Sequence, residues 1–96
     1  GIVKEVLIVG DTKDIVIDTS PEWSKYLSEK GYIGINGCSI TIGKIHDSRF
    51  QIHLIPETLK TTNLDNLVFG DEVNLEIDQS TIVIVDTTER ILKNKT

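Results

Sequence analysis

The chain of 96 residues has no methionine and only one cysteine, and each scarcity excludes something. A translated protein begins with methionine, so a chain that begins at Gly1 and has none is expected to be processed, excised or trimmed from a longer one. Cys38 has no second cysteine to pair with, which excludes an internal disulfide and predicts a reducing cytoplasm as the location.

Positive charge is scarce as well. Ten Lys and Arg residues face fifteen Asp and Glu residues, which gives a formal net charge of −5 and a pI near 4.8. Nucleic acids and anionic membranes are bound by clustered cations, so we expect neither as a partner. No apolar run approaches the ~20 residues of a membrane-spanning helix, and the first residues show no signal-peptide pattern.

What is present is the composition of one globular domain, with 39% hydrophobic and 26% charged residues. Residues 1–18 predict a β-hairpin, residues 39–46 and 50–55 a second one, and residues 72–78 a half-buried strand of period two. Six short strands with turn signals and no βαβ rhythm predict an all-β fold. We expect a small six-stranded antiparallel Greek-key closed β-barrel with short helices.

Three helical segments are predicted. Ser20 is a natural N-cap, Pro21 suits the first helical position and Gly31 suits the position after the helix, so a helix between them is expected to plug one end of the barrel. A short helix is expected over residues 57–61. Residues 82–85 favour a strand, so we expect a short extended segment before a terminal helix.

Two dense stretches suggest a binding site. The first, GINGCSIT at residues 34–41, combines glycines with hydroxyls, and its Ser39 and Thr41 share one face of a strand. The second, HLIPETL at residues 53–59, is a strand that runs into a proline and a helix start, where backbone N–H groups lack partners. From the residues alone, ordinary strand hydroxyls, a core Ile55 and a capping Thr58 remain open alternatives.

Metal binding and nucleophilic catalysis are not expected. His46 and His53 are seven residues apart on separate predicted strands, and no cysteine or carboxylate near them has ligand spacing. His46 is expected at the surface, while His53 can line the site. Cys38 has no base and orienting group patterned around it, so it is expected to be a small buried residue.

Four motifs together carry a resemblance to a known family. They are GxNGxSxT at residues 34–41, HLIPETLxxTxL at 53–64, GDxVNxExD at 70–78 and VDTxER at 85–90. In this order and spacing the chain resembles the C-terminal barrel of riboflavin synthase, a trimeric enzyme whose subunit carries two similar lumazine-binding domains in tandem. The resemblance extends from about Val3 to the terminal helix.

The resemblance implies a domain organisation. Residues 1–85 would be the second of two tandem barrels of a parent chain, and residues 86–96 the start of a C-terminal oligomerisation helix. The sister barrel and the Gly-His-[Val/Ile] segment that the family has just upstream are missing from this chain. The fragment by itself is therefore expected to be inactive, and the enzyme would be the parent homotrimer.

The resemblance also implies a reaction. Riboflavin synthase, a transferase, dismutates two molecules of 6,7-dimethyl-8-ribityllumazine into riboflavin and 5-amino-6-ribitylamino-pyrimidinedione, and it needs no cofactor. This domain would bind one of the two lumazines at an inter-subunit site, facing the N-terminal barrel of a neighbouring subunit. Both substrate and riboflavin are expected ligands.

The residues implied to bind substrate lie on both dense stretches and on the lysine before the first one. In the family this lysine reaches the ligand, the Ser and the Thr contact the lumazine, the isoleucine packs on the ring and the turn backbone bonds the pyrimidinedione edge. No residue is assigned a catalytic role. The implied set is Lys30, Ser39, Ile40, Thr41, His53, Leu54, Ile55, Pro56, Glu57 and Thr58.

Two rival functions remain open. Some proteins of this duplicated barrel family, such as bacterial lumazine proteins, carry a lumazine or flavin as a chromophore without catalysis. A purely structural barrel would leave the polar line-up at Ser39, Thr41 and Thr58 unexplained. Both stretches that suggest the binding site carry the motifs of the enzyme family intact, which favours the enzyme.

Overall fold

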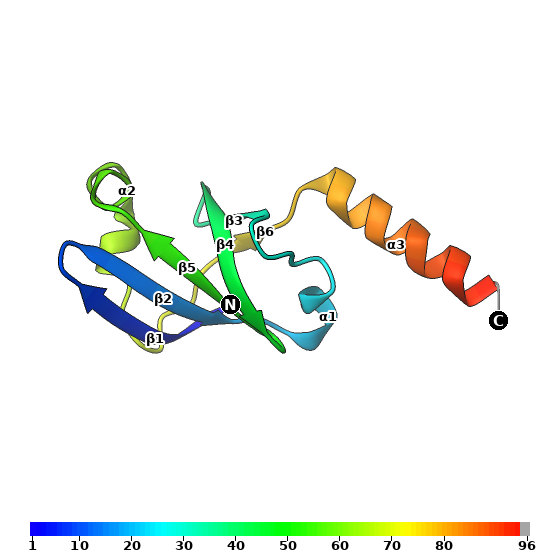
Figure 1. The fold of residues 1–96 in the computed structure, drawn as a ribbon, viewed down its shortest axis with the longest axis horizontal. Coiled ribbons are helices and arrows are strands. Elements are labelled where there is room, and N and C mark those ends of the chain that lie inside the picture. Colours follow the sequence, from blue (N-terminus) through cyan, green and yellow to red (C-terminus); the bar gives the residue numbers. More distant parts are fainter. Residues whose placement is uncertain (95–96) are drawn as a thin grey trace.

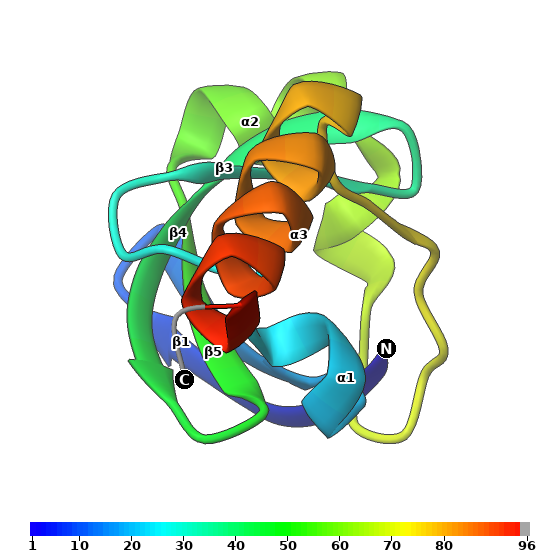
Figure 2. The ribbon, with the colours of Figure 1, turned by 90° about the vertical axis from the view of Figure 1, so that its right-hand side faces the viewer.

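The computed structural model describes residues 1–94. Figure 1 shows a body of strands and short helices from which one long helix extends, so the molecule measures 50 × 21 × 20 Å. Seen from the helix end in Figure 2, the strands and the segment that follows the second short helix are arranged around a common centre.

Six strands form the body in the order β1-β2-β5-β4-β3-β6, and every strand pair is antiparallel. The sheet curls into a half-barrel, so the predicted all-β antiparallel architecture with short helices is confirmed. The strands are β1 (Ile2–Val9), β2 (Thr12–Asp18), β3 (Tyr32–Ile35), β4 (Cys38–His46), β5 (Arg49–Leu54) and β6 (Leu75–Glu76).

Both predicted hairpins are confirmed. β1 and β2 are joined by Gly10 and Asp11 alone, and Gly10 adopts a φ of 63° that suits glycine. Asn36 and Gly37 alone join β3 to β4.

The predicted strand over residues 72–78 is only two residues long as β6. The residues before it bond to the start of the chain instead: the Val73 amide donates to the Gly1 carbonyl at 2.8 Å, and the Val3 amide donates to Asp71 at 2.9 Å. These bonds connect the last strand segment with the start of β1. Residues 72–78 do alternate between buried or half-buried and exposed positions, but their backbone bonds go to two partners. Residues 71–73 bond to the start of the chain, and Leu75 and Glu76 pair with β3.

The core lies inside the curl and consists of apolar side chains from alternate strand positions. Polar and charged residues at the positions between them face outward, as expected for a sheet with one buried face. None of the side chains classed as buried in the described part is polar. The buried set is Val3, Ile15, Ile17, Ile33, Ile35, Ile40, Ile42, Phe50, Ile52, Leu54, Leu64, Leu67 and Val73.

The predicted helix from Pro21 to Gly31 is mostly wrong. Helix α1 (Pro21–Ser24) makes a single turn, and Ser20 occupies its N-cap position without a side-chain capping bond. The residues at the end of the predicted helix bond to the sheet instead. The Lys30 amide donates to the Ile42 carbonyl at 2.9 Å, and the Ile42 amide donates to the Gly31 carbonyl at 2.8 Å. These tertiary bonds outweigh the local helical signal.

The short helix predicted after the second hairpin is confirmed as α2 (Pro56–Thr61), which is followed by the 3₁₀ turn η1 (Asn63–Asn66). Pro56 starts α2 as well as ending the strand. The Thr62 hydroxyl accepts a bond from the Leu64 amide and so caps η1, whose Leu64 is fully buried. This segment therefore fixes the end of β5 against the core.

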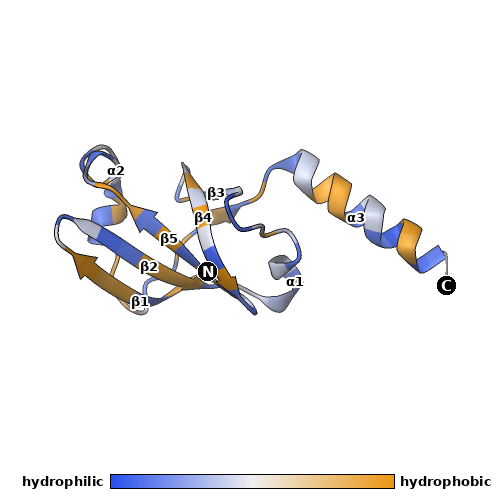
Figure 3. Cartoon of the chain, in the orientation of Figure 1, coloured by the Kyte–Doolittle hydropathy of each residue, from blue (hydrophilic) through white to orange (hydrophobic). Residues whose placement is uncertain are grey.

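The expected extended segment at residues 82–85 is wrong, because helix α3 (Gln79–Asn94) already begins at Gln79. β-branched residues favour strands only where a neighbouring strand accepts their backbone bonds, and here a helix satisfies the backbone internally. Figure 3 shows apolar and polar stretches alternating along α3, and none of its described residues is buried. The domain division at residue 85 stays a prediction.

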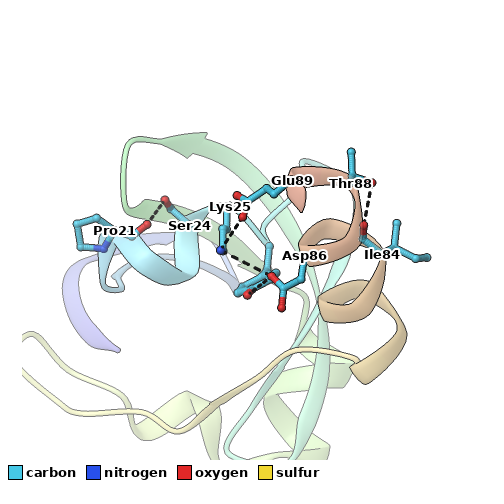
Figure 4. A network of polar contacts seen from close by, with 8 residues as sticks. Pro21, Ser24, Lys25, Ile84, Asp86, Thr88 and Glu89 are labelled. Atoms are coloured by element: carbon cyan, nitrogen blue, oxygen red, sulfur yellow. Dashed lines mark hydrogen bonds and ion pairs between the residues drawn. The ribbon is translucent and has the colours of Figure 1, made fainter. Parts of the chain in front are cut away.

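Polar contacts join α3 to the body beside α1 (Figure 4). Lys25 Nζ lies 3.0 Å from Glu89 Oε2, and Tyr26 Oη donates to Asp86 Oδ1 at 2.7 Å. The hydrogen bond to Glu89 raises the pKa of Lys25, and the hydrogen bond to Asp86 raises the pKa of Tyr26. Within the described residues no helix is long and apolar enough to cross a membrane.

Candidate functional site

Strand β4 changes partners half-way along. Residues 38–41 pair with β3, whereas Ile42, Ile45 and His46 pair with β5 across an irregular register. Figure 1 shows β4 and β5 joined at their hairpin and separating toward the start of β4 and toward α2. The two dense stretches of the sequence therefore lie at the diverging ends of these two strands.

The register between β4 and β5 begins at Ile42, so Cys38 to Ile40 have no cross-strand partner on β5. Ile42 directs both backbone groups to the other side, toward Lys30 and Gly31. Since the backbone groups of an antiparallel strand alternate in direction, those of Ser39 and Thr41 face the β5 side. A planar ligand with alternating donors and acceptors can be bound there by main-chain groups.

The side chains of β4 divide as predicted. Ser39 and Thr41 are exposed on the outward face, and Ile40 between them is buried in the core with 8% exposure. The side chain of Ile40 is therefore not available to a ligand, and by the same alternation its backbone groups face β3. The hydroxyl pair has Gly34 and Tyr32 as its cross-strand neighbours.

The end of β5 forms the second wall. His53 is exposed and its Nδ1 contacts Asp14 Oδ1 on β2, directly opposite in the register. Leu54 is fully buried, so its side chain is not available to a ligand, and its cross-strand partner is Lys13 on β2. His46 lies at the other end of the hairpin beside Asp47, and the described residues contain no group of three or more ligands that could hold a metal.

Ile55 is the apolar surface of this wall. It is 47% exposed, which contradicts the open alternative of a core residue, and its carbonyl accepts the first bond of α2 from Leu59. Pro56 and Thr58 behind it are half-buried, and Glu57 is exposed. The Thr58 carbonyl accepts from the amide and the hydroxyl of Thr62, which closes α2.

Lys30 lies beside the first wall. Its φ of 67° is left-handed, and its amide bond to Ile42 places its backbone next to the strand that carries Thr41. Its side chain is exposed. The structure thus places the backbone of Lys30 beside the end of β4 that carries Thr41, whereas the residues from His53 to Thr58 lie at the diverging end of β5.

A cavity of about 410 Å³ adjoins Ser39 on the outward face of β3, β4 and β6. Sequence reasoning missed two carboxylates that line it, Glu76 and Asp78. Alternation in the predicted strand already placed Glu76 on the outward face. The pairing of β6 with β3, which places Glu76 on the same face as Ser39, cannot be predicted from the alternation.

Comparison with known proteins decides the family, because residues 1–78 match the model of the lumazine binding domain. The chain belongs to the lumazine-binding domain family. It is 52% identical to riboflavin synthase of Escherichia coli (strain K12) over 68 residues, which are 71% of this chain and 32% of that enzyme. It is 49% identical to riboflavin synthase of Chlamydia pneumoniae over 73 residues, which are 76% of this chain and 36% of that enzyme.

This lumazine-binding domain spans about a third of the length of those curated relatives. Among solved structures it is similar to LumP complexed with riboflavin, with a TM-score of 0.78 and 25% identity over 83% of this chain and 43% of that one. LumP complexed with 6,7-dimethyl-8-(1′-D-ribityl) lumazine gives a TM-score of 0.74 and 27% identity over 80% and 42%.

LumP complexed with flavin mononucleotide gives a TM-score of 0.78 and 25% identity over 84% of this chain and 45% of that one. The resemblance to a riboflavin synthase barrel, predicted from four motifs, is confirmed by the family match and these relatives. The roles of the individual site residues stay predictions.

Proposed function

We propose that this domain binds 6,7-dimethyl-8-ribityllumazine or riboflavin where β4 and β5 diverge, and that its parent protein is a riboflavin synthase. One observation carries the proposal. Ser39 and Thr41 present exposed hydroxyls on β4 where it diverges from β5, and β5 leads into the exposed Ile55, in a chain that is 52% identical to a riboflavin synthase.

Each wall suits a different part of such a ligand. A lumazine is a flat ring with a polar pyrimidinedione edge and a ribityl chain. Ile55 offers an apolar surface to the ring, and the backbone from His53 to Thr58 offers donors and acceptors to its edge. Ser39, Thr41 and Lys30 would contact the polar chain, while the buried Ile40 and Leu54 would hold the two walls in place from the core.

The proposed reaction moves a four-carbon unit from one lumazine to another. The acidic methyl protons and the electrophilic ring carbons belong to the substrates, so the protein would act mainly by holding two rings face to face, a proximity effect of several kcal/mol. The second ring would lie on the N-terminal barrel of a neighbouring subunit in a homotrimer. This domain would then be one half of an inter-subunit site and inactive by itself.

We also propose that the half-barrel closes into a Greek-key barrel. The sheet order places the β3-β4-β5 meander beside β2, as a Greek key requires. The bonds from Val73 to Gly1 and from Val3 to Asp71 support closure between the last strand segment and the first.

The direct test is titration of the domain with riboflavin, followed by the ligand's fluorescence. We expect saturable binding that weakens at least about tenfold in the double variant Ser39→Ala/Thr41→Ala, because two hydrogen bonds to the ligand are lost. Thr87→Ala, an exposed threonine on α3, is the matched control and should bind like wild type. Equal binding by all three proteins would contradict the proposed site.

A chromophore carrier is the second candidate, favoured by the likeness to LumP, which has been solved with riboflavin and with lumazine. The parent chain separates the two candidates. Incubated with 6,7-dimethyl-8-ribityllumazine, a synthase converts two substrates into one riboflavin, whereas a carrier retains the lumazine unchanged. Absorbance of the released product distinguishes these outcomes.

A further inference from the structure

Three strands place Ser39, Gly34 and Glu76 in one row. Gly34 on β3 is the cross-strand partner of Ser39 on β4 and also of Glu76 on β6. Cross-strand partners lie on the same face, and neighbouring strands are about 4.8 Å apart, so Ser39 and Glu76 face outward about 10 Å from each other. Gly34, between them, carries no side chain.

The missing side chain of Gly34 creates a trough. A Cβ on Gly34 would lie 3.2 Å from the Cβ of Glu76 and 3.8 Å from its Oε2, so the carboxylate arm occupies the space beside the glycine. The floor of the trough is backbone, its one wall is the Ser39 hydroxyl, and its other wall is the Glu76 carboxylate. It forms part of the cavity of about 410 Å³ that adjoins Ser39.

The charge of this cavity has one sign. Its titratable lining groups are Tyr32, Glu76 and Asp78, and its described lining contains no Lys, Arg or His. Ser39, Tyr32 and Gln79 add neutral hydrogen-bonding groups from β4, β3 and the start of α3. Lys30 lies two residues before Tyr32 with an exposed side chain, outside the lining. The net charge of −5 adds no compensating positive field.

We propose that Glu76 and Asp78 select a neutral ribityl chain and reject a phosphorylated one, so that this domain prefers riboflavin to flavin mononucleotide. The inference rests on the proposed function, in which Ser39 contacts the ribityl chain. Ribityl hydroxyls can donate to carboxylates, whereas a phosphate ester carries about −1.5 to −2 charges and offers acceptor oxygens. LumP has been solved with both flavins, so selectivity would set this domain apart.

The test compares riboflavin and flavin mononucleotide as ligands of the domain by fluorescence titration at low salt. Wild type should bind riboflavin at least about tenfold more tightly, since like charges at this range repel strongly at low ionic strength. In Glu76→Gln/Asp78→Asn the ratio of the two dissociation constants, flavin mononucleotide to riboflavin, should fall to about threefold or less, chiefly because flavin mononucleotide binds better. Added salt should narrow the wild-type ratio in the same direction.

The matched control is Glu22→Gln/Glu72→Gln, which removes two exposed carboxylates outside the cavity. It changes the net charge equally and should keep the wild-type ratio. If wild type binds riboflavin and flavin mononucleotide equally well, the selectivity is refuted while the proposed function stands. If wild type binds neither flavin, the proposed function fails and this inference fails with it.

An unchanged ratio in Glu76→Gln/Asp78→Asn would show that these two residues are not the cause. Should the double variant unfold, as judged by circular dichroism, Glu76→Gln alone gives the same comparison. Lys30→Gln tests the nearby lysine. The ratio of dissociation constants should stay at or above the wild-type value. A fall in this ratio would mean that Lys30, rather than the cavity, sets the preference for riboflavin.

Discussion

Tyr26 donates its phenolic hydrogen to Asp86, 60 residues further along the chain, across a distance of 2.7 Å. This bond and the neighbouring pair of Lys25 and Glu89 connect the body to a helix with no buried residue among those described. Asp86→Asn combined with Glu89→Gln should therefore free α3 from the body and leave the core intact. Thr88→Ala is the matched control, because that hydroxyl bonds only within α3, to the Ile84 carbonyl.

Spin labels on α1 and α3 would measure this change. We expect a single distance in wild type and in Thr88→Ala, and a broad distribution in the double variant, with unfolding by urea unchanged. A narrow distribution in the double variant would mean that these carboxylates do not orient α3.

The same contacts predict a dependence on pH. The pKa values of Lys25 and Tyr26 are raised above the ordinary 10.5 and 10.0, so the folded protein binds these protons more tightly than the unfolded chain does. Their contribution is fully present below the ordinary values and is lost as pH rises through the raised ones. The distribution of distances between the labels should stay narrow from neutral pH to about 10 and broaden only at higher pH. Broadening already at neutral pH would contradict this assignment.

Ile55 should matter for binding and hardly at all for stability. Because its side chain is 47% exposed, Ile55→Ala should change the free energy of unfolding by no more than about 0.5 kcal/mol. Loss of its contact with the ring should weaken riboflavin binding about tenfold. Ile8→Ala, at the hairpin end with 64% exposure, tests the same exchange away from the site and should leave binding unchanged.

Ile52→Ala should have the opposite signature. Ile52 is fully buried between β2 and β4, so the truncation leaves a cavity and should lower the free energy of unfolding by about 2–5 kcal/mol. Urea unfolding followed by circular dichroism measures the difference. A loss below about 1 kcal/mol would indicate that the curled sheet does not pack as described.

Gly34→Ala should damage the site through Glu76. The new methyl group would lie 3.2 Å from the Cβ of Glu76, tighter than ordinary contact, so it fills the trough and Glu76 must shift away from it. We expect riboflavin binding to weaken several-fold while the melting temperature falls by only a few degrees. Gly34→Ala combined with Glu76→Gly removes the Cβ that the new methyl group meets and should restore part of the affinity.

The alternation of apolar residues was enough to predict both hairpins and the core. Phe50, Ile52 and Leu54 occupy every second position of β5 and all three are buried, and Ser39 and Thr41 face outward as their spacing indicates. Period-two burial is a local property of a strand, so it can be read without knowing the neighbours.

Three features could not be read because they depend on partners. Residues 82–85 are β-branched, yet they are helical where no strand lies beside them. The helix after Ser20 stops early because Lys30 and Gly31 bond to β4. Glu76 and Asp78 reach the site because β6 pairs with β3, a neighbourhood fixed by the whole sheet order.

The bond between the Gly1 amino group and the Val73 carbonyl, at 3.0 Å, joins residues 72 positions apart. Closing so long a loop has an entropic cost that must be met before the contact can form, so this fold has a high contact order and should fold slowly for its size. On the ribosome, the start of β1 can pair with β2 early, but its other edge must wait for residues 71 to 73 to emerge. Until then this edge is exposed to other nascent chains. The synthesis of α3 does not affect this delay, because α3 follows residue 73 in the chain.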